Sequence, residues 1–395
     1  MTSIALRRLG HNIRILERSP TPLLHDQGAG IVAGGEIPTF MEEYDRTRTQ
    51  YIVTSKQRLY LDKKGNITQK ENKQQHMTSW DVIYHICRAN FDRNQSSYTN
   101  SNALHDLPQE GKSVYQHGIA VTEVVEDGEG VKVSFKSTLA GEENEKPQVT
   151  KADFVIIADG SSSKIRKLLC PSSPERTYAG YVAFRGTIPE GELSKEAEAV
   201  FVGKFPFYHS EYTQILGYTI PNQGAVAPGK RLINWVWYVN VEGDSNEYRK
   251  IMTDTSGTTH RLTLPAGGHM LPEVWEAQKA NAIAMLPPQF AELVNKTKNP
   301  FVQAITDLEP PADKKCWLLG GKAVLVGDAL AGFRPHTAAS TAQAALHALM
   351  LARMFGGKLD KEEYQNEVID FATRLQNQGV VLGNRSQFGD HPLAD

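Results

Sequence analysis

Two pairs of adjacent residues, Asp159-Gly160 and Gly327-Asp328, each follow a short apolar segment and precede a stretch rich in serine, threonine or alanine. A carboxylate at the end of a buried strand can accept hydrogen bonds from sugar hydroxyls, and a glycine beside it lets a ligand approach the backbone. The free N–H groups at the start of a following helix can hold negative charge. Two such turns in one chain predict a single nucleotide cofactor that is held from several sides.

Strands and helices must hold these turns in place. For the second turn we predict a strand from Ala323 to Val326 and a long Ala-rich helix that begins near Thr337. For the first turn we predict a strand before Asp159 and a helix that Ser161–Ser163 cap. Both arrangements are strand, tight turn and helix, the geometry of a nucleotide site in an open α/β sheet.

The first residues of the sequence predict a similar unit. Ile4–Leu9 has the pattern of a helix end with Gly10 as its C-cap, and Asn12–Leu16 has the pattern of a short strand. Glu17 ends that strand, where dinucleotide folds place the carboxylate that binds a ribose. No first strand and no GxGxxG turn precede the helix, so we expect an N-terminally truncated form of such a fold.

Two further segments could contact a ligand. The loop from Leu23 to Gly35 contains Gly28 and Gly30, which either let the backbone approach a ligand or make a flexible surface loop. Thr78-Ser79 should cap a helix that carries Arg88 beside its apolar stripe, and this arginine meets either a phosphate or solvent.

The middle of the chain has the pattern of a largely antiparallel sheet. We predict strands at 181–187, 199–207, 214–220 and 231–241, and helices at 272–286, 288–295 and 361–376. The strands are dense in aromatic residues, which either form the core or wall a pocket for a planar substrate. The aromatic residues that we assign to such a pocket are Phe184, Phe207, Tyr218, Trp235 and Trp237.

Composition limits the class of protein. The 395 residues are 40% hydrophobic and 22% charged, which is enough for a large core in one or two domains. The formal net charge is −2 without blocks of like charge, so nothing indicates nucleic-acid binding. The three cysteines are too few and too distant for a disulfide framework or a zinc site. No apolar run approaches the ~20 residues of a membrane span, and we expect a cytoplasmic protein.

Six stretches are specific enough to compare with known families: LERSP (16–20), TSWDVIYHICR (78–88), VIIADGSSSKIR (155–166), YAGYVAFRG (178–186), INWVWY (233–238) and VLVGDALAGFRPHTAAS (324–340). Together they resemble the FAD-dependent aromatic hydroxylases of the para-hydroxybenzoate hydroxylase superfamily, and within it the 2,6-dihydroxypyridine 3-monooxygenase-like branch. The resemblance extends over almost the whole chain. It implies an α/β (α+β) fold in which a Rossmann-like FAD-binding domain accompanies a mainly antiparallel substrate domain.

The resemblance also implies domain limits and cofactor contacts. The FAD-binding domain would consist of residues 1–50, 76–174 and 300–380, the substrate domain of 51–75 and 175–299, and a C-terminal tail of 381–395. The cofactor-binding residues that it implies, from the adenosine end to the flavin ring, are Glu17, Arg18, Arg88, Asp159, Gly160, Arg166, Gly327, Asp328, Pro335, His336, Thr337, Ala338 and Ala339. Ser340 stands where the family has a glycine, and a left-handed backbone there would cost a serine ~1–2 kcal/mol.

The implied activity is that of a flavoprotein monooxygenase. NADH or NADPH reduces FAD, oxygen adds at the flavin C4a position, and the resulting hydroperoxide hydroxylates a small aromatic or heteroaromatic substrate. His209 or Tyr208 would deprotonate the substrate, although a lone histidine is more often structural. The alternatives are a non-catalytic remnant that binds FAD weakly, and a flavoprotein oxidase or dehydrogenase. The sequence leaves open whether the protein is a monomer or a homodimer.

Overall fold

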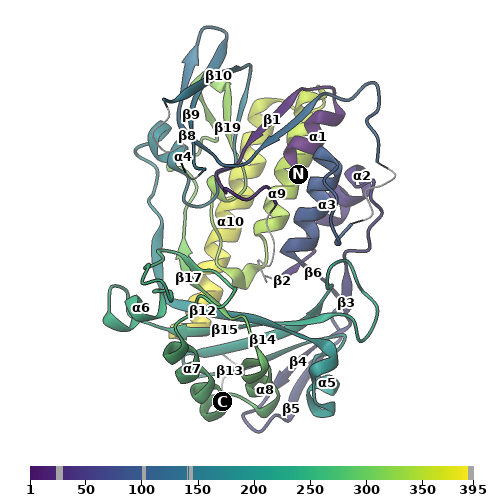
Figure 1. Ribbon diagram of the computed structural model, residues 1–395, viewed down its shortest axis with the longest axis vertical. Coiled ribbons are helices and arrows are strands. Elements are labelled where there is room, and N and C mark those ends of the chain that lie inside the picture. Colours follow the sequence, from purple (N-terminus) through teal and green to yellow (C-terminus); the bar gives the residue numbers. More distant parts are fainter. Residues whose placement is uncertain (24–29, 100–103, 140, 142–145, 390–395) are drawn as a thin grey trace.

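The computed structural model describes residues 1–23, 30–99, 104–139, 141 and 146–389. The predicted glycine-rich loop lies partly outside these ranges, Gly28 included. Small sheets and long helices occupy one end of the molecule, and a large sheet with its own helices occupies the other (Figure 1). Within the described ranges, no helix combines the length and the apolar character that crossing a membrane requires.

Two parallel strand pairs form the centre of the first body. β1 (Ile13–Leu16) pairs with β7 (Ser113–Gln116), and β11 (Val155–Ile157) pairs with β19 (Ala323–Leu325), both in parallel register. β18 (Trp317–Leu318) lies antiparallel on the other side of β19. Parallel pairs require crossover connections, and these are characteristic of a Rossmann-like fold. The predicted strands that carry Glu17, Asp159 and Asp328 are therefore confirmed.

Helices pack around these strands because their apolar stripes face inward. α3 (Trp80–Asp92) starts where the Ser79 hydroxyl accepts a hydrogen bond from Val82 N at 3.2 Å, as the sequence predicts. α1 (Thr2–Arg8), α2 (Ile37–Tyr44) and α3 share a hydrophobic cluster with α9 (Ser340–Phe355). The short α4 (Lys164–Leu169) follows β11. A separate antiparallel sheet consists of β8 (Ile119–Asp127), β9 (Gly130–Ser137) and β10 (Gln148–Ala152).

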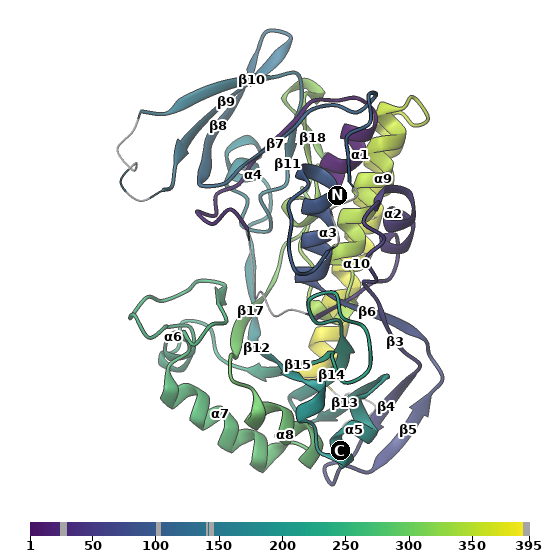
Figure 2. The same cartoon turned by 45° about the vertical axis from the view of Figure 1, so that its right-hand side comes forward.

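The last helix, α10 (Lys361–Phe388), begins with a capping box between Asp360 and Glu363. Its 28 residues correspond to roughly 42 Å of helix. In both views it runs from beside α9 to the large sheet (Figures 1 and 2). The predicted start of this helix is correct, but its predicted end at Gln376 is too early. Beyond that position most residues are polar, so the pattern does not indicate the face that packs on the sheet.

The second body is built on an eight-stranded sheet with the order β16-β17-β12-β15-β14-β13-β4-β5. Its strands are β4 (Gln57–Leu61), β5 (Ile67–Glu71), β12 (Thr177–Pro189), β13 (Lys204–Ser210), β14 (Thr213–Ile220), β15 (Leu232–Asn240), β16 (Thr263–Leu264) and β17 (Phe301–Asp307). All pairs are antiparallel except β13 with β4. The predicted mixed fold with a mainly antiparallel sheet is confirmed.

Helices cover one face of this sheet. They are α5 (Lys195–Phe201), α7 (Pro272–Met285) and α8 (Pro288–Lys296), and they enclose the largest hydrophobic cluster. The other face is turned toward the first body, with a small sheet of β2 (Gly30–Val32), β3 (Val53–Ser55) and β6 (Gln75–Ser79) against it. The prediction of a strand over 199–207 is wrong at its start, because residues 199–201 belong to α5, whose first turn Ser194 caps.

Candidate active site

The turns at Asp159-Gly160 and Gly327-Asp328 lie side by side. Ile157 pairs with Leu325, and Val326 N donates to Ile157 O at 3.0 Å, so both turns leave the same end of adjacent parallel strands. This edge is where open α/β sheets bind their ligands. Gly160 and Gly327 have φ angles of 77° and 56°, and a Cβ on either would have no neighbouring atom within 4 Å. The structure thus brings the two predicted turns together and leaves space beside both glycines.

Two arginines connect the turns. Arg166 Nη1 donates to Leu330 O and its Nη2 to Glu309 O, both at 2.7 Å, so this predicted site residue supports the second turn from behind. Arg176 was not predicted. Its Nη1 donates to Ser162 Oγ at 3.1 Å, and its positive charge lies close to Asp328.

Asp328 has a perturbed acidity. Burial raises the pKa of its carboxyl to about 6, while the charge of Arg176 and a hydrogen bond with Ser340 act in the opposite direction. The carboxylate is therefore ionised at neutral pH but close to titrating. Ser340 itself starts α9 with helical geometry, so the strain predicted there is absent. The left-handed residue of this loop is Ala338, with a φ of 53°.

Glu17 and Arg88 both lie close to Tyr115 of β7, the strand that pairs with β1. Glu17 Oε1 accepts from Ser19 N at 2.8 Å. The Arg88 guanidinium lies 3.6 Å from the ring centroid of Tyr115, donates to Pro22 O at 2.8 Å and pairs with Asp92 at 2.7 Å. Arg18 is exposed, and its backbone carbonyl accepts from Thr138. The residues predicted to bind the adenosine and the pyrophosphate of FAD therefore lie near the end of β1 and the segment that follows it.

The loop before α9 reaches the large sheet. Its 3-10 turn η4 (Pro335–Thr337) follows Arg334, which donates to both carboxylate oxygens of Asp307 at 2.8 and 2.6 Å. His336 Nε2 lies 3.0 Å from Tyr181 Oη, and the imidazole stacks on Tyr238 with ring centroids 4.4 Å apart. The loop that carries the predicted flavin-side residues is thus in direct contact with two buried tyrosines of the sheet.

The sheet face under this loop is a grid of three cross-strand rows. They are, from β13 to β12, His209–Gln214–Tyr238–Ala183, then Phe207–Leu216–Val236–Arg185, then Phe205–Tyr218–Asn234–Thr187. The middle row is apolar except for Arg185 at its β12 end, and the rows on either side of it carry the other polar side chains. A planar ring on such a floor would meet polar side chains only at its edges.

Arg185 and Asn234 form the polar group at one end of the grid. Arg185 Nη1 donates to Gln303 Oε1 at 2.7 Å and Nη2 to Gly30 O at 3.3 Å, while Gly30 N donates to Asn234 Oδ1 at 2.9 Å. A Cβ on Gly30 would lie 2.6 Å from Asn234 Cγ, so only glycine fits here. The close approach at Gly30 is to side chains of the sheet, and the predicted approach to a ligand stays a prediction.

Two hydrogen-bond donors in this group have no partner among the described residues. They are Arg185 Nε and Asn234 Nδ2, both buried. An unpaired buried donor costs about 1–3 kcal/mol, and such groups are tolerated where a ligand completes them. The sequence signal that could have found Arg185 is a charge inside the apolar run YVAFRG, which is rarely buried without a purpose.

The predicted pocket residues divide between the two faces of the sheet. Phe207 and Tyr218 lie on the face that carries Arg185. Phe184, Trp235 and Trp237 point the other way into the core under α7 and α8, so the prediction that they wall a pocket is wrong. Side chains alternate along a strand, and neighbours such as Phe184 and Arg185 cannot share a face.

The two predicted catalytic residues divide in the same way. His209 lies on the face of Arg185, 4% exposed, with Gln214 Nε2 at 3.5 Å from its Nε2. Tyr208 packs in the core on the opposite face, where it cannot reach a substrate on the Arg185 side.

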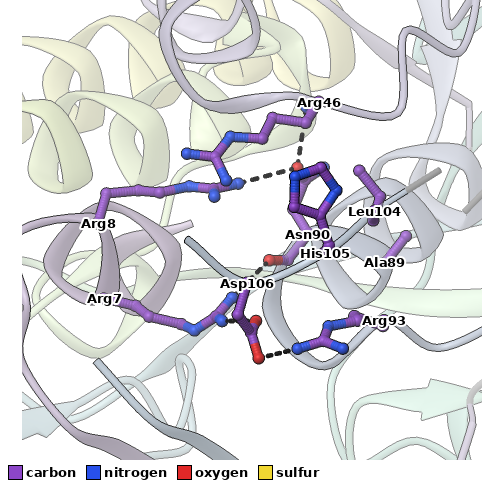
Figure 3. Close-up of a pocket in the computed structure, with 9 residues that line it drawn as sticks. All are labelled: Arg7, Arg8, Arg46, Ala89, Asn90, Arg93, Leu104, His105 and Asp106. Atoms are coloured by element: carbon purple, nitrogen blue, oxygen red, sulfur yellow. Dashed lines mark hydrogen bonds and ion pairs between the residues drawn. The ribbon is translucent and has the colours of Figure 1, made fainter. Parts of the chain in front are cut away.

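Two depressions lie apart from this site. Figure 3 shows the first, where Arg7 and Arg93 pair with Asp106, and Arg8 and Arg46 N donate to Asn90 Oδ1. Glu110 pairs with Arg7, Arg8 and Arg46 behind it. Its cavity of about 10 Å³ is too small for more than a water molecule. The second is an open polar groove of about 610 Å³ between residues 47–50, 97–99 and 223–224. Neither contains a predicted site residue.

Comparison with known proteins agrees with this geometry. Residues 178–307 match the family model described as FAD binding domain-like. The chain is 28% identical over 397 residues to 2,6-dihydroxypyridine 3-monooxygenase from Paenarthrobacter nicotinovorans, covering 95% of this chain and 89% of that protein. It is 36% identical over 78 residues to an FAD-dependent urate hydroxylase from Klebsiella oxytoca, covering 20% of this chain and 18% of that protein.

Solved structures share the fold. 2,6-Dihydroxypyridine-3-hydroxylase from Arthrobacter nicotinovorans superposes with a TM-score of 0.80 at 24% identity, covering 98% of this chain and 91% of that chain. HpxO from Klebsiella pneumoniae, complexed with FAD and uric acid, gives 0.70 at 18% identity, covering 99% and 87%. The resemblance to the FAD-dependent aromatic hydroxylases is confirmed.

The structure also singles out residues that were not predicted as site residues. Arg176 links the two turns, Gln303 and Asn234 accompany Arg185, and Tyr181 contacts His336. Tyr181, Asn234 and Gln303 come from strands that are largely buried on both faces, so no periodicity singles them out. Only the pairing of the strands shows that they converge.

Proposed function

We propose that this chain is an FAD-dependent monooxygenase that hydroxylates a small aromatic or heteroaromatic compound with NAD(P)H and O2. The observation that carries the proposal is the contact of His336 with Tyr181 and Tyr238. This contact joins the loop that follows Gly327-Asp328 to the sheet face that holds Arg185. A cofactor on that turn and a planar substrate on that face would therefore be neighbours.

The residues at the turns fit FAD. Gly160 and Gly327 have open space beside them, and Asp328 offers a carboxylate that burial makes a strong acceptor. Glu17 offers a second carboxylate at the end of β1, and Arg88 a cation near it. Sugar and ribityl hydroxyls require acceptors, and a pyrophosphate requires a cation, so this donor and acceptor set suits a flavin dinucleotide. Pro335–Ala339 would border the flavin ring.

The sheet face fits an electron-rich ring that carries oxygen or nitrogen substituents. Arg185 Nε and Asn234 Nδ2 are donors that find no acceptor in the described part of the chain, and Arg185 adds a positive charge. Such a pair would stabilise negative charge on a ring oxygen and fix the orientation of the ring. Phe207 and Tyr218 would line the edge beside it. His209 stands at the far row as the proposed proton acceptor.

Bound FAD would supply hydride acceptance from NAD(P)H and activation of O2 for transfer of one oxygen atom. The chain itself would orient the ring on Ala183 and Val236 and exclude water between the sheet and β2. Tyr181 Oη and His336 Nε2 share a hydrogen bond at 3.0 Å, and burial raises the pKa of Tyr181, so this tyrosine stays protonated and holds the imidazole in one orientation. Water exclusion protects a reactive oxygen donor from wasteful decay.

The test is to purify the protein with added FAD, record its flavin absorbance, and follow NADH and NADPH oxidation with and without 2,6-dihydroxypyridine. Substrate-stimulated oxidation and a product heavier by one oxygen atom are expected. A product without added oxygen would instead indicate an oxidase or dehydrogenase. A protein that fails to bind FAD at saturating concentration would be the non-catalytic remnant.

A further inference from the structure

Side chains on one face of α9 form hydrogen bonds along the turn that carries Asp328. Ser340, Gln343 and His347 follow each other at helical spacing of three and four residues, so their side chains share that face. Ser340 hydrogen-bonds the Asp328 carboxylate, Gln343 Nε2 donates to Ala331 O at 2.9 Å, and Gly327 N donates to His347 Nδ1 at 2.8 Å. The two ends and the middle of the turn are therefore each held by one α9 side chain.

His347 is the unusual member of this group. It is 0% exposed, and burial lowers its pKa to about 3, so the imidazole is neutral at physiological pH. Because Nδ1 accepts the hydrogen bond from Gly327, the ring proton is on Nε2, which has no partner among the described residues. Burying an imidazole with one nitrogen unpaired destabilises the fold. What it provides is Nδ1, a fixed hydrogen-bond acceptor for Gly327 N.

Gly327 explains why this acceptor matters. Its φ of 56° lies in the left-handed region, where glycine moves easily between conformations. The residue after it is Asp328. A small rotation of the Gly327 peptide would redirect the carboxylate, so the hydrogen bond to His347 removes a freedom that the glycine otherwise permits.

We propose that His347 is a positioning residue for the cofactor: its Nδ1, together with Gln343, fixes the Gly327–Ala331 turn so that Asp328 faces the hydroxyl groups of the bound flavin. This inference rests on the proposed function. The turn's other backbone carbonyls at 329 and 330 are occupied by Arg166. The carboxylate of Asp328 thus stands on a backbone that buried side chains hold from behind.

Three variants separate positioning from packing. His347→Leu fills the space but removes the acceptor, whereas His347→Asn retains an acceptor atom near the position of Nδ1 but leaves a cavity. Tyr364→Phe is the control, because its ring lies 6.3 Å from that of His347 and its buried hydroxyl has no described partner. The measurements are the FAD dissociation constant by quenching of flavin fluorescence and the melting temperature of the FAD-free protein.

We expect His347→Leu to weaken FAD binding about tenfold, because the turn loses the hydrogen bond that fixes its first residue. His347→Asn should stay within about threefold of the wild type although it melts at lower temperature through its cavity, and Tyr364→Phe should bind FAD normally. An unchanged dissociation constant in His347→Leu overturns the proposal. So does His347→Asn that binds as weakly as His347→Leu.

Hydrogen–deuterium exchange of the FAD-free protein distinguishes failure of this inference from failure of the proposed function. The peptide containing residues 323–333 should exchange faster in His347→Leu than in the wild type, His347→Asn or Tyr364→Phe. If the wild type binds no FAD, the proposed function fails and the cofactor role of His347 fails with it, whatever the exchange shows. If the wild type binds FAD but exchange is equal in all four proteins, His347 does not hold the turn and this inference alone fails.

Discussion

Arg185 is a buried cation whose Nε has no acceptor within the described chain, and this unsatisfied state sets its expected role. Replacing it with methionine should lower kcat/KM for 2,6-dihydroxypyridine about 10- to 100-fold, mainly through KM, because a charge-assisted hydrogen bond to the substrate contributes about 1.5–3 kcal/mol. FAD content should not change. Arg58→Met is the matched control, since Arg58 also lies over aromatic rings of the sheet, at 5.6 Å from Phe205. Equal effects of the two substitutions would contradict the assignment.

Asp328 has a pKa raised to about 6 by burial, which gives two opposite pH effects. In the FAD-free protein, the raised pKa means that the folded state binds the proton more tightly than the unfolded state. Stability from this group is therefore fully present below the ordinary aspartate pKa and is lost as pH rises through about 6. Asp328→Asn should abolish that pH dependence, as thermal denaturation between pH 4 and 7 would reveal.

The same carboxylate should make cofactor binding depend on pH in the other direction. Protonation removes an acceptor for hydroxyl groups, so the FAD dissociation constant of the wild type should rise as pH falls through about 6. Asp328→Asn should bind FAD more weakly at neutral pH and without this dependence. A titration whose midpoint is the same in both proteins would assign the effect to another group.

At the scale of elements, α10 passes the loop before α9 at two glycines, of which the close packing requires only one. A Cβ at Gly383 would lie 2.4 Å from Tyr181 Oη and 2.9 Å from Arg334 Cδ, whereas a Cβ at Gly379 would meet nothing closer than 3.4 Å. Gly383→Ala should thus destabilise the protein by about 1–3 kcal/mol through overpacking. Gly379→Ala should be neutral or stabilising, because alanine favours a helix by up to ~1 kcal/mol. Chemical denaturation of both variants measures the difference.

The two turns could be predicted from the sequence, whereas the face of β12 and the end of α10 could not. The turns at Asp159 and Asp328 were predicted because strand, turn and helix signals are local, and pairing of β11 with β19 then brought them together. The face of β12 was not predictable. All six residues from Tyr181 to Gly186 are buried, so the strand shows no alternation that would separate Phe184 from Arg185. The end of α10 was missed because its contacts on the sheet are with residues far away in sequence.

At the scale of the whole molecule, the last three turns of α10 join the two bodies, beside the His336 loop and the backbone at Gly30. In this segment Ser386 Oγ donates to Gln214 Oε1 at 2.8 Å, Gln387 O accepts from Asn240 Nδ2 at 2.7 Å, and Phe388 packs on Tyr181. The parallel-strand body and the large sheet each keep a hydrophobic cluster that does not depend on these contacts.

Truncation before Gly379 should therefore weaken the coupling of the two bodies without unfolding either one. We expect scanning calorimetry to show one thermal transition for the FAD-bound full chain and two for the truncated chain, because each cluster then melts alone. Arg334 would also lose its hydrogen bond to Asn384 Oδ1 at 2.8 Å, so the loop that holds His336 should loosen and the truncated protein should bind FAD less tightly. The paired substitution Ser386→Ala and Asn240→Ala, which removes only the two polar contacts, should give a smaller shift in the same direction. A single transition at the wild-type temperature in the truncated chain would mean that contacts other than α10 couple the two bodies.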